Sequence, residues 1–258
     1  MKEKEWRSLT FKCFLLLLSV VTVCVIYSCM TAGRESINVK AGQGYDKSDM
    51  NIVDKNNNTQ YEPLKSSKAG GKVIVIDAGH GGDDEGAVSF DGKINEKDYT
   101  LLIVKELKDI LDKSDITAYY TRLSDKYVSK KERVKLVNEM DADMMISIHC
   151  NASDEWTSTA NGSEALFSKR KTGRKKLTNK KLAKLLSDNV SDNVGIRNRG
   201  IIQREDLYLM HHSKVPTAII ETGYITDKSD LRYIVSKSGR RKIAHGIYNA
   251  IVEAYKFL

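Results

Sequence analysis

The 258-residue chain has only two prolines and four cysteines, and aromatic residues make up 7% of it. Cys13, Cys24 and Cys29 lie close to the N-terminus, so Cys150 alone is left in the rest of the chain and a disulfide-stabilised scaffold is excluded. Low complexity is excluded as well, because glycines number 17 and no repeat is present. The hydrophobic share of 41% is enough to bury a core.

Positive charge is in excess, with a formal net charge of +8. This balance favours an acidic partner, but it does not distinguish nucleic acid, anionic lipid and anionic cell-wall polymer. Nine cations without an acidic residue lie between Lys169 and Lys184. Such a run is either a solvated surface or a site that attracts an anionic wall polymer or an acidic protein. The chain has no nucleic-acid reader motif, and we therefore expect no nucleic-acid partner.

The N-terminus has the pattern of an export segment. Four basic residues in 1–12 precede an uncharged, Leu- and Val-rich run over 13–33. A cleaved signal has an apolar core of about 7–15 residues and a spanning helix needs roughly 17–25, so this run reaches the lower end of spanning length. Residues 1–33 are predicted to be a signal peptide or a signal anchor, with lipidation at Cys29 as a third form. The rest of the chain is then exported to the outer face of the cytoplasmic membrane or the cell wall.

Residues 34–71 contain few apolar side chains and are predicted to be a flexible linker. The pattern then changes to apolar strands that alternate with amphipathic helices. Strands are expected over 73–76, 116–121, 144–148, 165–168 and 217–220, and helices over about 96–111, 129–140, 177–194 and 243–254. This alternation predicts one α/β domain over 72–258.

Residues able to bind metal or to move protons follow three of the predicted strands. His80 lies in the glycine-rich turn after the first strand, His149 ends the third, and Glu221 follows the last. In an open α/β sheet the ligand crevice lies beyond the carboxyl ends of the strands, so these side chains are expected to meet there. Glu96, at the start of the first helix, is close enough to fold back over the same crevice. Two imidazoles and a carboxylate are a common ligand set for catalytic zinc, and a second carboxylate would supply the acid/base.

Other interpretations of these residues are weaker. The turn after the first strand lacks the last glycine of a dinucleotide-binding fingerprint, because Asp84 stands at that position, and no Gly-Lys-Ser/Thr follows. Cys150 next to His149 is typical of a small buried residue rather than a nucleophile. His211 and His212 are predicted to lie in a loop outside the ligand set.

The motifs resemble, in order along 72–257, those of one enzyme family. They are Ile76-Asp77-Ala78-Gly79-His80-Gly81-Gly82, Asn95-Glu96-Lys97, Thr121-Arg122, Arg133, Asn138, Ser147-Ile148-His149-Cys150-Asn151, Gly162-Ser163-Glu164 and Glu221-Thr222-Gly223-Tyr224. The set resembles the zinc-dependent N-acetylmuramoyl-L-alanine amidases of bacterial cell-wall turnover, of the amidase-3 type. The resemblance implies a single three-layer α/β domain with a twisted, mostly parallel sheet flanked by helices.

The same resemblance implies roles for individual residues. His80, Glu96 and His149 match the ligands of one zinc ion, and Glu221 matches the catalytic glutamate. Arg122, Arg133 and Glu164 match family positions and are predicted to contact substrate. For the two arginines, orientation of Glu96 and structural ion pairing stay open as alternatives.

The resemblance also implies a substrate and partners. The substrate is peptidoglycan, cleaved at the amide between the lactyl group of N-acetylmuramic acid and the L-alanine of the stem peptide. Alternatives are another zinc peptidase or amidase acting on peptides, and a spore-cortex amidase that requires an activating protein. A non-catalytic wall-binding relative is disfavoured, because all four site residues are present.

Overall fold

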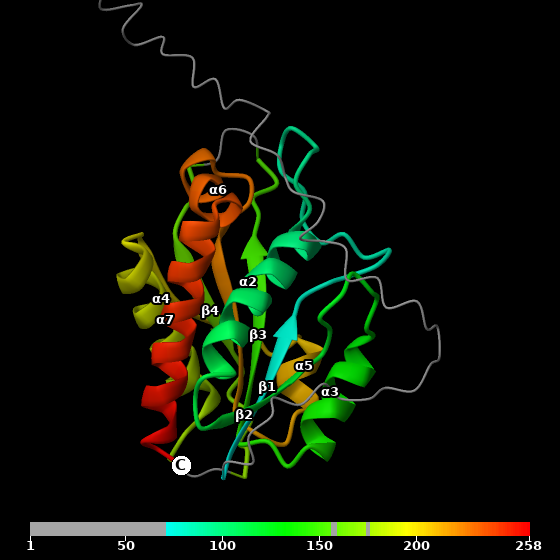
Figure 1. Cartoon of the computed structure of the whole chain (residues 1–258), viewed down its shortest axis with the longest axis vertical. Coiled ribbons are helices and arrows are strands. Elements are labelled where there is room, and N and C mark those ends of the chain that lie inside the picture. Colours follow the sequence, from blue (N-terminus) through cyan, green and yellow to red (C-terminus); the bar gives the residue numbers. More distant parts are fainter. Residues whose placement is uncertain (1–70, 156–158, 174–175) are drawn as a thin grey trace, which may run out of the picture. The chain divides into compact units, whose positions relative to one another are not determined.

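A computed structural model describes residues 71–155, 159–173 and 176–258 (Figure 1). All of them belong to one compact unit. The prediction for the N-terminal segment 1–33 and nearly all of that for the linker 34–71 fall outside the described residues. Among the residues that the structure describes, no helix is long and apolar enough to cross a membrane.

Six strands form one mixed sheet. They are β1 (Lys72–Ala78), β2 (Ile116–Tyr120), β3 (Met144–Asn151), β4 (Ser163–Phe167), β5 (Asn198–Gln203) and β6 (Thr217–Tyr224). The strand order is β2-β1-β3-β6-β4-β5. All neighbouring strands are parallel except β4 and β6, which are antiparallel. The prediction of a mostly parallel sheet is confirmed.

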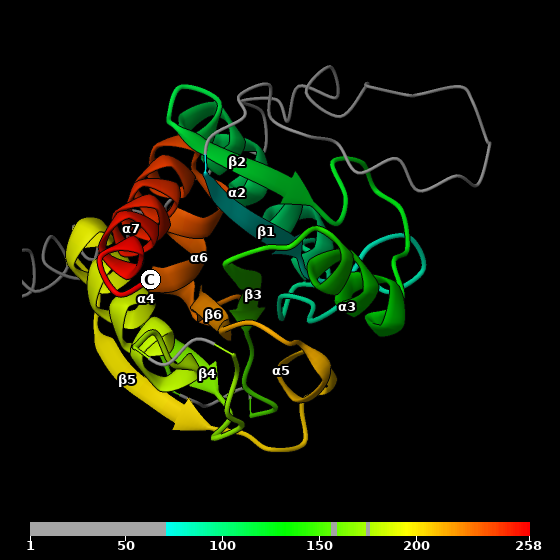
Figure 2. The same cartoon turned by 90° about the horizontal axis from the view of Figure 1, so that it is seen from below.

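Helices cover the two faces of the sheet unequally (Figure 2). The helices are α2 (Glu96–Leu111), α3 (Lys130–Glu139), α4 (Asn179–Val194), α5 (Tyr208–His212), α6 (Lys228–Val235) and α7 (Lys237–Tyr255). The long helices α2, α4 and α7 pack on one face, and the shorter α3 and α5 lie on the other (Figure 2). The predicted three-layer arrangement is therefore present.

Alternation along the strands explains this division. Ile148 of β3, Ile220 of β6 and Ala165 of β4 belong to the main core beneath α2, α4 and α7. Successive side chains of a strand point to opposite faces, so the residue next to each of these three points to the face of α3 and α5. The smaller core on that face includes Val75 and Met145.

Local sequence signals account for several helix ends. Ser129 and Glu132 form the predicted capping box at the start of α3. Thr178 caps α4 by accepting a hydrogen bond from the backbone N–H of Lys181, and Gly195 ends α4 in the left-handed conformation with φ 81°. The elements β5, α5 and α6 were not predicted. The prediction that His211 and His212 lie in a loop is wrong, because both belong to α5.

Candidate metal and catalytic site

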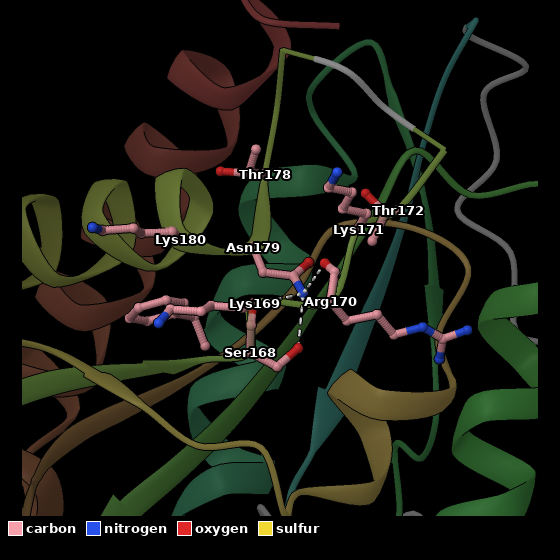
Figure 3. A pocket seen from close by; sticks show the side chains of 9 residues that line it. Ser168, Lys169, Arg170, Lys171, Thr172, Thr178, Asn179 and Lys180 are labelled. Carbon is pink, nitrogen blue, oxygen red and sulfur yellow. Dashed lines mark hydrogen bonds between the residues drawn. The ribbon is translucent and has the colours of Figure 1, made fainter.

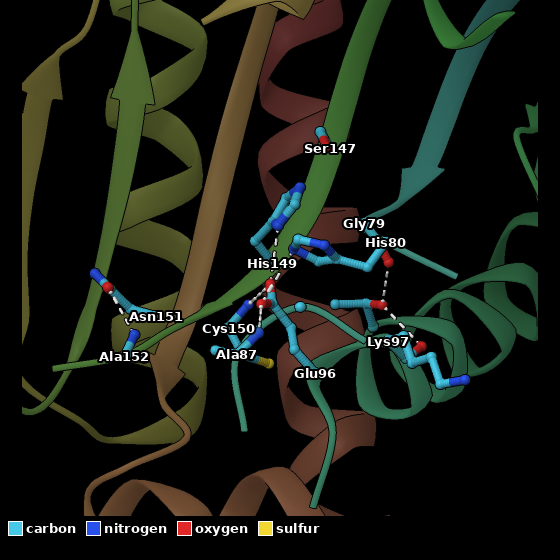
Figure 4. A network of polar contacts seen from close by, with 12 residues as sticks. Gly79, His80, Ala87, Glu96, Lys97, Ser147, His149, Cys150, Asn151 and Ala152 are labelled. Carbon is cyan, nitrogen blue, oxygen red and sulfur yellow. Dashed lines mark hydrogen bonds and ion pairs between the residues drawn. The ribbon is translucent and has the colours of Figure 1, made fainter. Parts of the chain in front are cut away.

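His80, Glu96 and His149 come together at the carboxyl ends of β1 and β3, where the sequence placed them (Figure 4). One possible ligand atom from each residue lies within 4.8 Å of the others. Glu96 Oε1 is 2.9 Å from His149 Nδ1, and Glu96 Oε2 is 3.1 Å from His80 Nε2. The Glu96 side chain is only 5% exposed, whereas His80 and His149 keep 24% and 20% of their side-chain surface exposed. The two imidazoles are thus partly exposed to solvent, whereas the Glu96 carboxylate is buried.

The turn after β1 presents His80 in an unusual backbone conformation. Its φ of 60° is uncommon for a residue other than glycine and is found where the surroundings fix the chain. The Asp84 carboxylate, 2.8 Å from His80 Nδ1, holds the ring from behind and leaves Nε2 directed at Glu96. Gly86 has φ +69°, and a Cβ there would lie 2.7 Å from both Glu96 Oε2 and the His80 ring. Glycine at this position is therefore required by the close approach of the two ligands.

Glu96 is fixed by backbone donors as well as by imidazoles. Its Oε2 accepts a hydrogen bond from the N–H of Ala87 at 2.9 Å, and its Oε1 accepts one from the N–H of Cys150 at 2.9 Å. Burial raises the pKa of this carboxyl, but the hydrogen bonds and charges of His149 and His80 outweigh it and hold the pKa far below its usual range. Glu96 is consequently an anion under all physiological conditions.

The three side chains fit a divalent metal ion. Two imidazole nitrogens and one carboxylate are a zinc donor set that leaves a position for water. The site also stabilises positive charge: burial lowers the pKa of His149, yet the Glu96 carboxylate raises it to about 9. A bound cation would replace this proton. Asp84 behind His80 is the kind of outer partner that metal-binding histidines have.

Glu221 lies beside this cluster on the same face of the sheet. It is the register partner of His149 across β3 and β6, and Glu164 is its register partner across β4 and β6. All three side chains point away from the main core, toward the less covered face. Glu221 Oε2 is buried and has no hydrogen-bond partner among the described residues. Burial is the main cause that raises the pKa of Glu221 to about 7, with Glu96 and Glu164 adding to it.

Glu164 has the partners that Glu221 lacks. Its Oε1 accepts a hydrogen bond from Asn151 Nδ2 at 2.6 Å, and its Oε2 accepts one from Arg199 Nε at 2.9 Å. Arg199 was not a sequence candidate, because β5 has no clear apolar pattern. The Asn-Arg-Gly sequence that contains it gives only a weak turn signal.

Arg122 and Arg133 are buried, with 1% and 5% exposure, and they hold the turn that carries His80. Arg122 donates hydrogen bonds to the backbone oxygens of Ala78, Gly79 and Lys97. Arg133 donates to the oxygens of Ala78 and His80 and forms an ion pair with Asp77. These contacts agree with the structural alternative considered for the two arginines. Their role as substrate ligands stays a prediction.

The side chains of the remaining sequence candidates are not part of the metal cluster. Burial raises the pKa of the Cys150 thiol well above its ordinary value, which disfavours a nucleophilic thiolate. His212 stacks on Tyr208, with ring centroids 3.9 Å apart. Within the described residues, His80, Glu96 and His149 are the grouped metal-ligating side chains.

Four cations of the basic run line a surface pocket of about 450 Å³ next to the start of α4 (Figure 3). Its charged residues are Lys169, Arg170, Lys171 and Lys180. Asn179, at the start of α4, joins two parts of the pocket wall, because its Nδ2 donates a hydrogen bond to Ser168 O at 3.2 Å. The solvated and the ligand-binding interpretations of this run both stay open.

Fold and site together define an α/β protein with a candidate metallohydrolase centre at the carboxyl ends of its strands. The sequence matches the N-acetylmuramoyl-L-alanine amidase family over residues 74–253. The germination-specific N-acetylmuramoyl-L-alanine amidase of Bacillus subtilis (strain 168) is 31% identical over 215 residues, which are 77% of this chain and 86% of that protein. The chain therefore belongs to the N-acetylmuramoyl-L-alanine amidase family, as its motifs predicted.

Coverage differs among the relatives. The amidase LytC of Bacillus subtilis (strain 168) is 32% identical over 186 residues, but these are 72% of this chain and only 36% of LytC. The chain thus spans about a third of that relative.

Solved structures support the same conclusion. The crystal structure of N-acetylmuramoyl-L-alanine amidase from Clostridium difficile 630 matches with a TM-score of 0.66 and 31% identity, covering 73% of this chain and 98% of that one. The CwlD amidase from Clostridioides difficile, solved in complex with the GerS lipoprotein, matches with a TM-score of 0.65 and 27% identity over 72% of this chain and 98% of that one.

Proposed function

We propose that this chain hydrolyses the amide between the lactyl group of N-acetylmuramic acid and the L-alanine of the stem peptide in peptidoglycan. The observation that carries the proposal is that Glu221 lies on the strand next to His149, in register with it, and so stands beside the His80–Glu96–His149 cluster. An acid/base beside a metal site is what hydrolysis of an unactivated amide requires.

His80, Glu96 and His149 would hold one zinc ion. The ion, when bound, polarises the scissile carbonyl and lowers the pKa of a water molecule toward about 7 from roughly 15.7 in bulk. Asp84 keeps the His80 ring in its orientation, and the N–H groups of Ala87 and Cys150 keep Glu96 in its own. These contacts preorganise the donor set before the ion arrives.

Glu221 acts as the general base and then as the general acid. Its carboxylate takes a proton from the attacking water as the water oxygen bonds to the amide carbon. It then gives a proton to the alanine nitrogen as the carbon–nitrogen bond breaks, so the products are a lactyl carboxylate and a free amino terminus. A pKa of about 7 suits both steps, because the group can hold and release a proton near neutral pH.

The three residues predicted to contact substrate receive different roles. For Arg122 and Arg133 we propose indirect action: they fix the backbone that presents His80. For Glu164 we propose contact with the substrate beside Glu221, since it shares that face of the sheet.

Peptidoglycan lies outside the cytoplasmic membrane, so this activity requires the export predicted for residues 1–33, with the chain held at the membrane or in the wall. A protein activator is a further proposal, supported by the similar CwlD amidase having been solved in complex with the GerS lipoprotein. A role in sporulation or germination is supported by the germination-specific relative.

The test is digestion of purified peptidoglycan by the purified chain, followed by mass spectrometry of the soluble products. The expected products are stem peptides with a free amino-terminal alanine, together with glycan that carries free lactyl carboxylates. A chelator should abolish their release and added Zn²⁺ should restore it. Cleavage between two amino acids of the stem would instead identify a zinc peptidase and refute the proposal.

A further inference from the structure

Arg199 reaches the catalytic face through an irregularity in the edge strand β5. Ser163 pairs with Asn198 and Ala165 pairs with Ile201, so Arg199 and Gly200 together lie opposite Glu164 alone. This is the pattern of a β-bulge, which redirects a side chain. Gly200 has φ +83°, a conformation that favours glycine. As a result Arg199 shares a face with Glu164, while Ile201 still packs toward the main core.

Neighbouring residues hold this bulge. The Asn198 side-chain oxygen accepts a hydrogen bond from the Gly200 N–H at 2.7 Å, and Ser187 Oγ donates to Gly200 O at 2.9 Å. The bulge is thus anchored to α4, and its conformation does not depend on Arg199 itself.

The guanidinium of Arg199 is held in place by its neighbours, but not all of its N–H donors form hydrogen bonds. Its Nε donates to Glu164 Oε2 at 2.9 Å, and its Cζ lies 5.1 Å from the centre of the Tyr224 ring. Nη1 makes a long contact of 3.5 Å with Asn161 O, and Nη2 has no hydrogen-bond partner among the described residues. The side chain is 27% exposed. An arginine held through Nε and stacked on a ring presents its terminal nitrogens in a fixed orientation, which suits bidentate binding of a carboxylate.

The position of Arg199 relative to the reaction follows from the sheet. His149, Glu221, Glu164 and Arg199 occupy one level on the adjacent strands β3, β6, β4 and β5. Strands are about 4.8 Å apart, so the backbone of Arg199, two strands away, lies about 10 Å from that of Glu221. An extended peptide advances about 3.3–3.6 Å per residue. The guanidinium is therefore within reach of the second and third residues of a peptide whose first residue is at Glu221.

We propose that Arg199 binds a carboxylate of the stem peptide, at its second or third residue, and so selects acidic stems; this rests on the proposed amidase function. The sugar side of the substrate offers no anion, because the lactyl carboxyl is consumed in the amide. The carboxylates of the peptide are then the groups that a cation on this face can recognise. Arg199 is a specificity residue, and the stem lies across β6, β4 and β5 during cleavage.

The experiment uses two soluble N-acetylmuramoyl tripeptides that differ only in having all carboxyl groups free or all amidated. KM and kcat are measured for the wild-type chain, Arg199→Gln and Arg199→Lys. With the free-carboxyl substrate we expect Arg199→Gln to raise KM about tenfold, because a charge-assisted hydrogen bond to the substrate is lost. Any change in kcat that follows from loss of the Arg199–Glu164 pair should be the same for both substrates. With the amidated substrate the KM of the same variant should match the wild-type KM. Arg199→Lys should recover part of the preference.

Arg241 provides a matched control, since its Nε donates to Glu106 Oε2 at 3.0 Å with the same geometry but on α7. Arg241→Gln should leave the KM values for both substrates unchanged. Equal KM values of the wild type for the two substrates, or an equal rise for both in Arg199→Gln, would overturn the proposal while leaving the amidase function intact. Failure of the wild type to cleave either substrate would instead refute the amidase function.

Discussion

Glu164 lies directly opposite Glu221 across the antiparallel pair of β4 and β6. Two carboxylates at this spacing repel each other, and their surroundings differ. Glu164 is neutralised by Arg199 and bonded to Asn151, whereas Glu221 Oε2 is buried without a hydrogen-bond partner in the described part of the chain. Of the two, Glu221 is therefore the residue that holds the proton. This difference in surroundings assigns the acid/base role to Glu221 and leaves Glu164 ionised.

Glu221→Gln should nearly abolish catalysis while leaving the metal bound. Glutamine keeps the shape of the side chain but cannot exchange a proton, and general acid–base help contributes about 10²–10⁴-fold to the rate. The measurement is stem-peptide release from purified wall, together with zinc content of the same sample. Glu139→Gln, at an exposed position of α3, should retain full activity. Wild-type turnover in Glu221→Gln would show that the base is another group.

The stability of the metal-free chain should fall as the pH rises from about 4.5 to about 7. The pKa of Glu221 is raised from 4.5 to about 7 by burial, so across this window the folded state binds the proton more tightly than the unfolded state. Above it, the difference amounts to about 3 kcal/mol of lost stability. Urea unfolding of wild type and Glu221→Gln at several pH values measures this, and the variant should lack most of the fall. Parallel pH curves for the two proteins would mean that Glu221 titrates normally.

Asp84→Asn should weaken zinc binding without removing a ligand. The Asp84 carboxylate lies 2.8 Å from His80 Nδ1 and sets the ring orientation, and loss of such an outer partner typically costs 10–100-fold in metal affinity. Competition with a chromogenic chelator gives the dissociation constant. The adjacent Asp83 is exposed, and Asp83→Asn is the matched control that should bind zinc normally. Equal affinities of the two variants would contradict the proposed role of Asp84.

Arg133→Met should lower the free energy of unfolding by about 3–5 kcal/mol, because it leaves the buried Asp77 carboxylate without its ion-pair partner. Burial raises the pKa of Asp77, but the Arg133 charge and the hydroxyls of Ser147 and Thr121 bring it below 3.8. The stabilisation is therefore present above pH about 3.8 and is lost as the pH falls through the lower pKa of the folded state.

Urea unfolding at pH 7 and at pH 3 measures this effect. Arg241→Met breaks an exposed pair and should cost less than about 1 kcal/mol. A similar small cost for Arg133→Met would show that the Asp77 pair is not structural.

The sequence predicted best those strands, helix ends and site residues that depend on one local pattern. The strand containing Ile148 is a continuous apolar run because both its faces are covered up to His149, and a residue at the carboxyl end of such a strand can be placed in the crevice before the fold is known. The capping box at Ser129 is equally local. Glu96 could be placed because helix α2 begins at this residue, a short loop after the glycine-rich turn.

Other features depend on contacts between distant segments. No local pattern in the sequence marks Arg122 and Arg133 as buried, yet both are, and the backbone oxygens of the His80 turn accept their hydrogen bonds. Strand β5 is an exposed edge with a bulge, so neither periodicity nor hydrophobicity marks it. Arg199 becomes a candidate only when the register of β5 against β4 is known.

The unequal covering of the sheet determines how a solid substrate can approach. The two imidazoles lie at the edge of the thinly covered face and keep about a fifth to a quarter of their surface in contact with solvent, since His149 is 20% and His80 24% exposed. A site whose imidazoles remain in contact with solvent needs no free polymer end, and it can attack a stem anywhere along an intact, cross-linked meshwork. Perforation of the wall at interior points, rather than trimming from its loose ends, is the pattern of erosion that this architecture favours.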